Sequence, residues 1–173
     1  PMDSGRLLYK GSGCAMVTPF TKENTVDCAA LRKQAAFQLE NGTDALIVCG
    51  TTGEASTMDA REQAEAVGMV VEAADGRVPV IAGVGGNDTA RAIRTCRQAR
   101  SLGADAVLAV TPYYNKTTQA GLVAHFTALA EASELPVLLY NVPSRTGLNL
   151  LPATAEELAA HENIVGLKEA CGD

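Results

Sequence analysis

Short apolar runs rich in Val, Ile and Leu recur about every thirty residues along this chain of 173 residues. Longer stretches with helical spacing separate these runs. Short, nearly continuous apolar strands that alternate with helices indicate parallel strands covered by helices. The runs begin near Cys14, Ala45, Pro79, Ala106, Pro136 and Ile164. The alternation therefore predicts an α/β fold built on parallel strands.

The segments between the runs carry signals for the start and end of helices. Residues 26–41 place Leu31, Ala35 and Leu39 on one face and end at Asn41-Gly42, a pair typical of a helix stop. The next helix is predicted to begin at Thr57 as its N-cap, with Asp59 and Glu62 in the first turn. Further helices are predicted after Asn87, Thr118 and Pro152.

Two fold classes accommodate this repeat. Eight strand–helix units would need about 240 residues, close to the ~250 typical of a TIM (β/α)8 barrel, whereas this chain supplies five units and a sixth strand. It is either a truncated barrel, forming one incomplete domain over residues 1–173, or a complete doubly wound open sheet. The glycine run at 83–88 has Asp88 where the dinucleotide fingerprint requires a third glycine, so that fingerprint fails.

Composition excludes several classes of protein. The chain is 47% hydrophobic, carries a net charge of −6 and has no basic cluster, so nucleic acid is an unexpected partner. No apolar run reaches the ~20 residues of a membrane helix, and no secretion signal is evident. The five cysteines are an odd number without a Cys-x-x-Cys pair, which favours free thiols in the cytoplasm over disulfides or a metal site.

Polar and glycine-rich residues follow most of the apolar runs, at the edge where parallel α/β folds bind ligands. Thr51 and Thr52 lie between glycines where a strand meets a helix, and their hydroxyls could hold a small carboxylate, although a tight turn explains them equally well. Tyr114 follows a proline after the fourth run, and Arg145 lies in a turn after the fifth. The alternative for Tyr114 is packing within its loop, and the alternative for Arg145 is a loop charge exposed to solvent.

Lys168 is the most informative residue. Alternation along the sixth run places it on one side with Ile164 and Gly166. On the inner side of a barrel, a lysine would be desolvated and its amine would become available as a nucleophile. The alternative is a lysine at a strand end that reaches solvent.

Four motifs together resemble the dihydrodipicolinate synthase family, in order along the chain from Gly13 onward. They are Gly50-Thr51-Thr52-Gly53-Glu54, Val110-Thr111-Pro112-Tyr113-Tyr114-Asn115, Tyr140 through Gly147, and Gly166-Leu167-Lys168-Glu169-Ala170. The wider superfamily includes N-acetylneuraminate lyase and the keto-deoxy sugar acid aldolases, but the paired threonines and tyrosines favour the synthase. The resemblance implies a TIM (β/α)8 barrel, truncated here to five βα units plus strand six.

The resemblance also implies a lyase reaction of lysine and diaminopimelate biosynthesis that needs no metal or organic cofactor. Lys168 would form a Schiff base with pyruvate, and the derived enamine would attack aspartate semialdehyde. Tyr140, Thr51 and Tyr114 would relay protons, with Tyr114 reaching into a neighbouring site across a dimer interface. Thr51 and Thr52 would hold the pyruvate carboxylate, and Arg145 would receive the second substrate.

The chain departs from the family in length, because the last two strands are missing. Six strands cannot close the usual eight-stranded barrel, so strands one and six would have open edges. Three hypotheses therefore stand: the synthase, as a homo-oligomer (a dimer or tetramer); another pyruvate-dependent aldolase that acts on N-acetylneuraminate or a keto-deoxy sugar acid; or a silent fragment that assembles with other chains through its open edges.

Overall fold

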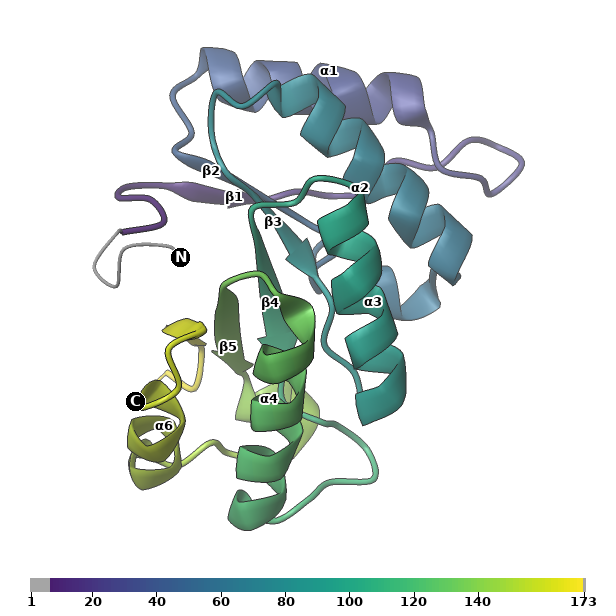
Figure 1. Cartoon of the computed structure of the whole chain (residues 1–173). Coiled ribbons are helices and arrows are strands. Elements are labelled where there is room, and N and C mark those ends of the chain that lie inside the picture. The colour runs from purple at the N-terminus through teal and green to yellow at the C-terminus, as the bar shows by residue number, and fades with distance from the viewer. Residues whose placement is uncertain (1–6, 173) are drawn as a thin grey trace. The chain divides into compact units, whose positions relative to one another are not determined.

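The computed structural model describes residues 7–172 and contains six strands and six α-helices in those residues (Figure 1). The strands are β1 (Gly13–Ala15), β2 (Ala45–Val48), β3 (Val80–Gly83), β4 (Ala106–Val110), β5 (Val137–Asn141) and β6 (Ile164–Glu169). The helices are α1 (Cys28–Glu40), α2 (Ala60–Ala74), α3 (Thr89–Ser101), α4 (Gln119–Ser133), α5 (Pro143–Thr146) and α6 (Pro152–Ala159), with a short 3-10 helix η1 (Ala55–Thr57) before α2. All six apolar runs form strands, which confirms the predicted alternation.

Two of the strands begin one residue after the proline that opens their apolar run. Pro79 precedes β3 and Pro136 precedes β5, and neither has an N–H to donate to a strand ladder. Their carbonyl oxygens still accept hydrogen bonds from the N–H groups of Leu46 and Val107, at 3.0 and 2.9 Å. A proline is therefore compatible with the position just before these strands, where only its carbonyl is needed.

The chain divides into two compact units, and the first comprises residues 1–83 with 101–105. In this N-terminal unit, β2 pairs in parallel with β1 and with β3. Figure 1 shows α1 and α2 side by side, and their buried faces include Leu31 and Ala35 of α1 and Val70 of α2. Two of the three residues predicted to share a face of the first helix are thus buried.

The second unit comprises residues 84–100 with 106–173 and contains the other three strands. Here β5 pairs in parallel with β4 and with β6. Helix α4 packs against α6 and β5, and its Phe126 and Leu129 are fully buried with Leu139 of β5 and Leu158 of α6. The prediction that residues 1–173 form one domain stays a prediction.

The N-terminus of α2 differs from the sequence prediction. Asp59, rather than Thr57, is the N-cap: its carboxylate accepts the N–H groups of Arg61 and Glu62, and the Glu62 carboxylate accepts the Asp59 N–H. Thr57 ends η1, where its hydroxyl donates to the carbonyl oxygen of Glu54 at 2.9 Å. A reciprocal capping box satisfies two backbone donors, whereas the Thr57 hydroxyl is occupied upstream. The predicted cap was wrong for this reason.

The glycines at 83 and 85 are explained by packing. A Cβ at Gly83 would lie 1.9 Å from the carbonyl oxygen of Cys49, and one at Gly85 would lie 2.2 Å from the backbone nitrogen of Val110. Such close approach of neighbouring backbones excludes every residue with a side chain. Asp88 accepts the N–H of Arg91 in the first turn of α3, so this aspartate starts a helix.

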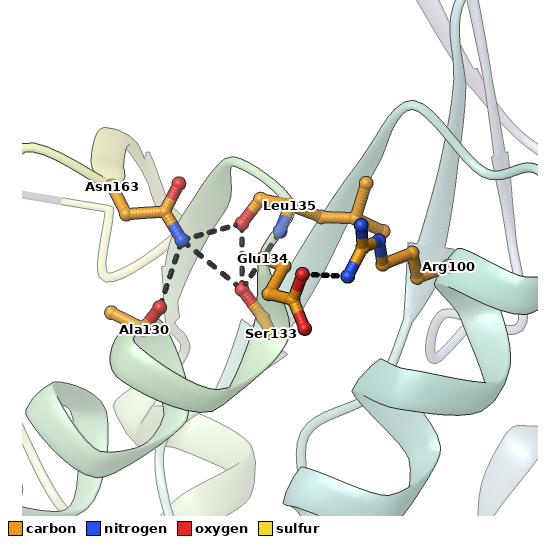
Figure 2. A network of polar contacts seen from close by, with 6 residues as sticks. All are labelled: Arg100, Ala130, Ser133, Glu134, Leu135 and Asn163. Atoms are coloured by element: carbon orange, nitrogen blue, oxygen red, sulfur yellow. Dashed lines mark hydrogen bonds and ion pairs between the residues drawn. The ribbon is translucent and has the colours of Figure 1, made fainter. Parts of the chain in front are cut away.

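A polar network fastens the amino end of β6 to the end of α4 (Figure 2). The Asn163 side chain donates to the carbonyl oxygens of Ala130 and Leu135, at 2.8 Å each, and to the buried hydroxyl of Ser133 at 3.2 Å. Ser133 in turn donates to Leu135. These bonds satisfy backbone carbonyls that the end of a helix leaves without partners.

Within residues 7–172, no helix has both the length and the apolar character needed to cross a membrane.

Candidate active site

Lys168 and Tyr140 lie side by side at the carboxyl ends of β6 and β5. They are register partners in the parallel pair, and the Lys168 ammonium nitrogen lies 4.3 Å from the centre of the Tyr140 ring. Tyr140 is buried and Lys168 is half-buried. A cation over an aromatic face is attracted by the ring quadrupole. The packing of β5 against β6 therefore places the amine directly against a tyrosine.

The predicted alternation along β6 is confirmed. Val165 and Leu167 are 51% and 42% exposed, whereas Ile164 is buried and Gly166 and Lys168 are half-buried. Lys168 thus lies on the more enclosed face of the strand rather than projecting freely into solvent.

The opposite face of the same strand ends carries a polar network that the sequence reasoning missed. Asn141 follows Tyr140 and is 1% exposed; its side-chain amide donates to the Glu169 carboxylate at 2.9 and 3.2 Å. This bond, with further bonds from Cys171 and Ala170, holds the pKa of Glu169 below its ordinary value. Alternation along the strands could have indicated this network, because Asn141 and Glu169 each directly follow a predicted site residue and so lie on the opposite face.

Tyr114 stands on a strained turn after β4. Its side chain is 88% exposed, and its φ of 67° lies in the left-handed region, as does that of Lys116 at 46°. Asn115, between them, donates from its side chain to the carbonyl oxygen of Asn87. Such conformations are uncommon for residues other than glycine and tend to cluster at functional sites. The turn directs Tyr114 into solvent, away from the core of its own unit.

Arg145 lies in α5, the single helical turn that directly follows β5. Pro143 occupies the first turn of this helix, and Gly147 ends it with a φ of 69°, a conformation that glycine adopts at little cost. Thr146 is buried, whereas Arg145 is exposed. The short helix therefore holds the Arg145 guanidinium in solvent a few residues beyond Tyr140.

Thr51 and Thr52 belong to the N-terminal unit, on the turn after β2. Both are exposed, while the neighbouring Gly53 is buried. The Gly53 carbonyl accepts the Thr18 hydroxyl at 2.7 Å, and a Cβ at Gly53 would lie 3.1 Å from the Met16 carbonyl oxygen. Two left-handed residues, Cys49 and Glu54, bound the turn. The turn is thus fixed through its glycine while the two threonines face outward.

Two cysteines and one histidine of the chain are buried. Burial raises the pKa of the Cys49 and Cys96 thiols to about 12, which keeps them protonated and unreactive. His125 is buried in α4, where its Nδ1 shares a hydrogen bond of 2.8 Å with the Thr89 hydroxyl, and burial lowers its pKa. Among residues 7–172, no group of three or more His, Cys, Asp and Glu side chains is arranged to hold a metal ion.

The C-terminal unit therefore contains four of the six predicted site residues: Tyr114, Tyr140, Arg145 and Lys168. It brings Lys168 and Tyr140 into contact and places Tyr114 and Arg145 on turns that follow β4 and β5. All four lie at or just beyond the carboxyl ends of parallel strands, where active sites of (β/α) barrels are found. The roles predicted for these residues stay predictions.

Comparisons with known proteins agree with this arrangement. The dihydrodipicolinate synthetase family matches residues 8–173. The 4-hydroxy-tetrahydrodipicolinate synthase of Geobacter sulfurreducens is 56% identical over 165 residues, which are 95% of this chain and 57% of that protein. The enzyme of the same name from Thermoanaerobacter sp. (strain X514) is 55% identical over 96% of this chain and 56% of its own length.

Solved structures also match. The chloride-inhibited dihydrodipicolinate synthase from Acinetobacter baumannii, in complex with pyruvate, is 48% identical and superposes with a TM-score of 0.94 over 96% of this chain and 57% of that one. The chain thus spans somewhat more than half the length of these relatives. The match confirms the predicted fold class, the (β/α) barrel family, of which this chain contributes six strands. With four motifs in order, two sets of three parallel strands and relatives at 55–56% identity, this chain belongs to the dihydrodipicolinate synthetase family.

Proposed function

We propose that this chain carries the Schiff-base chemistry of a 4-hydroxy-tetrahydrodipicolinate synthase, which condenses pyruvate with aspartate semialdehyde in lysine and diaminopimelate biosynthesis. The observation that carries the proposal is the position of the Lys168 amine, 4.3 Å from the centre of the Tyr140 ring on the enclosed face of β6. Relatives at 55–56% identity bear this enzyme's name, and one related structure holds pyruvate.

Lys168 is the nucleophile in this proposal. Its amine, once deprotonated, attacks the keto carbon of pyruvate, and loss of water from the resulting carbinolamine gives the imine. The imine then draws electrons from the pyruvate methyl carbon, which loses a proton and becomes an enamine. The enamine carbon bonds to the aldehyde carbon of aspartate semialdehyde. These steps need no metal or organic cofactor.

Tyr140 is the proton carrier for the lysine, because its ring lies against the amine at which water must leave. Tyr114 and Thr51 extend this relay. The exposure of Tyr114, on a turn with two left-handed residues, fits a side chain that serves the site of a neighbouring copy. We therefore propose that the working form is a homo-oligomer, a dimer or a tetramer.

Substrate carboxylates are bound at two places in this proposal. Thr51 and Thr52 receive the pyruvate carboxylate, supported by their exposed side chains on a turn fixed through Gly53. Arg145 receives the carboxylate of aspartate semialdehyde, supported by its exposed guanidinium beyond β5. A cytoplasmic location accompanies the proposal, in keeping with the free thiols of Cys14, Cys28, Cys49 and Cys96.

Trapping with borohydride tests the central step. The chain is incubated with pyruvate, reduced, digested and analysed by mass spectrometry, and we expect one reduced pyruvyl group on the Lys168 peptide. Lys168→Arg should abolish trapping, whereas the matched variant Lys116→Arg, at an exposed lysine of the same unit, should retain it. A label on another lysine would refute the assignment.

Turnover separates the synthase from other pyruvate-dependent aldolases, since all of them would trap pyruvate. Consumption of aspartate semialdehyde is compared with that of N-acetylmannosamine and of a sugar aldehyde under the same conditions. We expect turnover with the semialdehyde only; preferential use of either sugar would favour an aldolase.

A second candidate function is a fragment that acts only by assembling with other chains. The specific observation in its favour is the exposed apolar pair Val165 and Leu167 on β6, a surface of the kind that marks interaction sites. Light scattering at several concentrations tests it. An active, folded monomer would exclude this candidate.

A further inference from the structure

We propose that Asn141 and Glu169 form a positioning pair that fixes the register of β5 on β6 and so holds Lys168 against Tyr140. The proposal rests on the function proposed above, in which Lys168 and Tyr140 act together. Neither Asn141 nor Glu169 contacts substrate in this account. They act through the two residues that precede them.

Every hydrogen-bonding group of the Asn141 side chain has a partner. Its amide nitrogen donates to the Glu169 carboxylate and, at 2.7 Å, to the Asn149 side-chain oxygen, while its own oxygen accepts the Leu150 N–H at 3.0 Å. Its backbone carbonyl accepts the Ala170 N–H at 2.9 Å. A buried amide that satisfies all of its groups is costly to disturb. Asn141 therefore ties together β5, the end of β6 and the segment that follows α5.

Register explains why this tie matters for Lys168. Tyr140 is paired with Lys168, and the next residues, Asn141 and Glu169, are paired with each other. Successive side chains of a strand point to opposite faces. The bond between Asn141 and Glu169 on one face therefore sets which residues are paired on the other face, where Lys168 lies. A slip of one residue would move Lys168 to the other face.

The pairing of β5 with β6 depends on this bond because its register is interrupted nearer the amino end of the two strands. Val137 is paired with Ile164, but Leu138 is paired with Gly166, so β6 contains one extra residue at this point. Such an irregularity loosens the ladder locally. The register of Lys168 is consequently decided by contacts beyond the interruption, where the Asn141–Glu169 pair lies.

The charge of Glu169 strengthens the pair. A hydrogen bond to an ionised acceptor is stronger than one between neutral groups, and the Glu169 carboxylate accepts from both Asn141 and the Cys171 N–H. The same network anchors the segment after α5, since Asn149 and Leu150 bond to Asn141. The pair thus also constrains the connection between α5 and α6.

The test uses the whole chain and three variants. Asn141→Asp sets two carboxylates against each other. Glu169→Gln alone weakens the pair mildly, and it keeps the test decisive if Asn141→Asp does not fold, because Glu169 is exposed. The double variant Asn141→Asp, Glu169→Gln restores a donor and an acceptor with their positions exchanged. Rescue by this exchange is not expected if Asn141 only fills space.

The first readout does not depend on any reaction with pyruvate. The Tyr140 ring should shift the NMR signals of the Lys168 ε-methylene protons upfield of those of the other four lysines, Lys10, Lys22, Lys33 and Lys116. Lys168→Arg identifies the signal. We expect the upfield shift to be lost in Asn141→Asp, reduced in Glu169→Gln and recovered in the double variant. An unchanged shift in both single variants would overturn the proposal.

The second readout is the rate of pyruvate trapping. We expect a loss on the order of 10- to 100-fold in Asn141→Asp, since displacements near 1 Å at a reacting group cost this much, and recovery in the double variant. Asn163→Asp is the matched control, because Asn163 also donates three side-chain bonds but at the amino end of β6. If it moves the Lys168 signal as far as Asn141→Asp does, the effect is general destabilisation and the proposal fails.

The two proposals fail in different ways. If the wild-type chain does not trap pyruvate while the Lys168 signal still follows the variants as expected, the function is refuted and the positioning pair stands. If trapping occurs but neither the signal nor the rate responds to the variants, the pair is refuted and the function stands.

Discussion

An asparagine side chain forms hydrogen bonds at each end of β5 and β6, and the two asparagines differ in the charge of their acceptors. At the amino end, Asn163 donates to the carbonyl oxygens of Ala130 and Leu135 and to the Ser133 hydroxyl, all neutral acceptors belonging to α4 and the residues after it (Figure 2). At the carboxyl end, Asn141 donates to the ionisable carboxylate of Glu169.

The two ends also differ in the side chains and backbone conformations that surround the strands. The amino end joins helix to strand with neutral partners, and its ion pair between Arg100 and Glu134 is exposed. The carboxyl end holds an amine against a tyrosine, and left-handed residues at Tyr114 and Lys116 stand on the turn after β4. In parallel α/β folds, the carboxyl end hosts function and the amino end supports stability.

Removal of one hydroxyl at the carboxyl end should have the largest effect. Tyr140→Phe keeps the ring against Lys168 but removes the hydroxyl that we propose carries the proton, so turnover should fall by about 10²–10⁴-fold while thermal unfolding stays nearly unchanged. Steady-state kinetics and a melting curve on the same preparation measure both. Near-normal turnover would remove Tyr140 from the mechanism and weaken the contrast between the ends.

A substitution at the amino end should give the reverse pattern. Asn163→Leu removes the donor to three acceptors and leaves the buried Ser133 hydroxyl and two carbonyls with fewer partners. The free energy of unfolding should fall by about 1–3 kcal/mol, measured by urea denaturation. Pyruvate trapping by the folded fraction should match that of wild type. A loss of trapping that exceeds the unfolded fraction would mean that the two ends are coupled.

A third prediction concerns helix α4, which connects the two ends. Burial lowers the pKa of His125, so the unfolded chain binds a proton more readily than the folded chain. The stability contribution of neutral His125 is therefore fully present above the ordinary histidine pKa of about 6.5. As the pH falls below that value, the free energy of unfolding decreases by up to ~1.4 kcal/mol per pH unit. The loss stops below the folded pKa.

The measurement is urea denaturation between pH 7.5 and 5, with His125→Gln as the control, since a glutamine oxygen accepts from the Thr89 hydroxyl without titrating. The wild type should lose more stability than the variant over this range. Parallel curves for the two proteins would show that His125 does not contribute.

The smallest effect is expected at the Arg100–Glu134 ion pair. Both side chains are largely exposed, and exposed pairs contribute about 0–1 kcal/mol. Arg100→Ala should shift the urea midpoint only slightly, and added salt should reduce the difference further. A larger, salt-independent loss would show that this pair is a structural part of the amino end rather than an accessory to it.

The order and type of the main elements could be predicted from the amino-acid sequence, because these follow from local patterns. Apolar runs such as 45–48 and 106–110 form strands where predicted, and Thr118 caps α4 through its bond to the Gly121 N–H. The face of Lys168 was likewise predictable, since alternation along one strand is a local property.

Where two local signals compete, the sequence could not rank them. Thr57 and Asp59 are both good N-caps, and the choice depended on which side chain was already occupied: the Thr57 hydroxyl donates upstream to Glu54, while Asp59 forms a box with Glu62.

The contacts of Lys168 and Asn141, in contrast, depend on the packing of one strand against another. The partner of Lys168 depends on the register of β5 against β6, which changes after Val137 and joins residues about thirty positions apart. No local pattern encodes that shift, because it arises from packing between strands. For the same reason no local pattern predicts the bonds of Asn141 to Glu169, Asn149 and Leu150, which form only when β5 and β6 lie side by side.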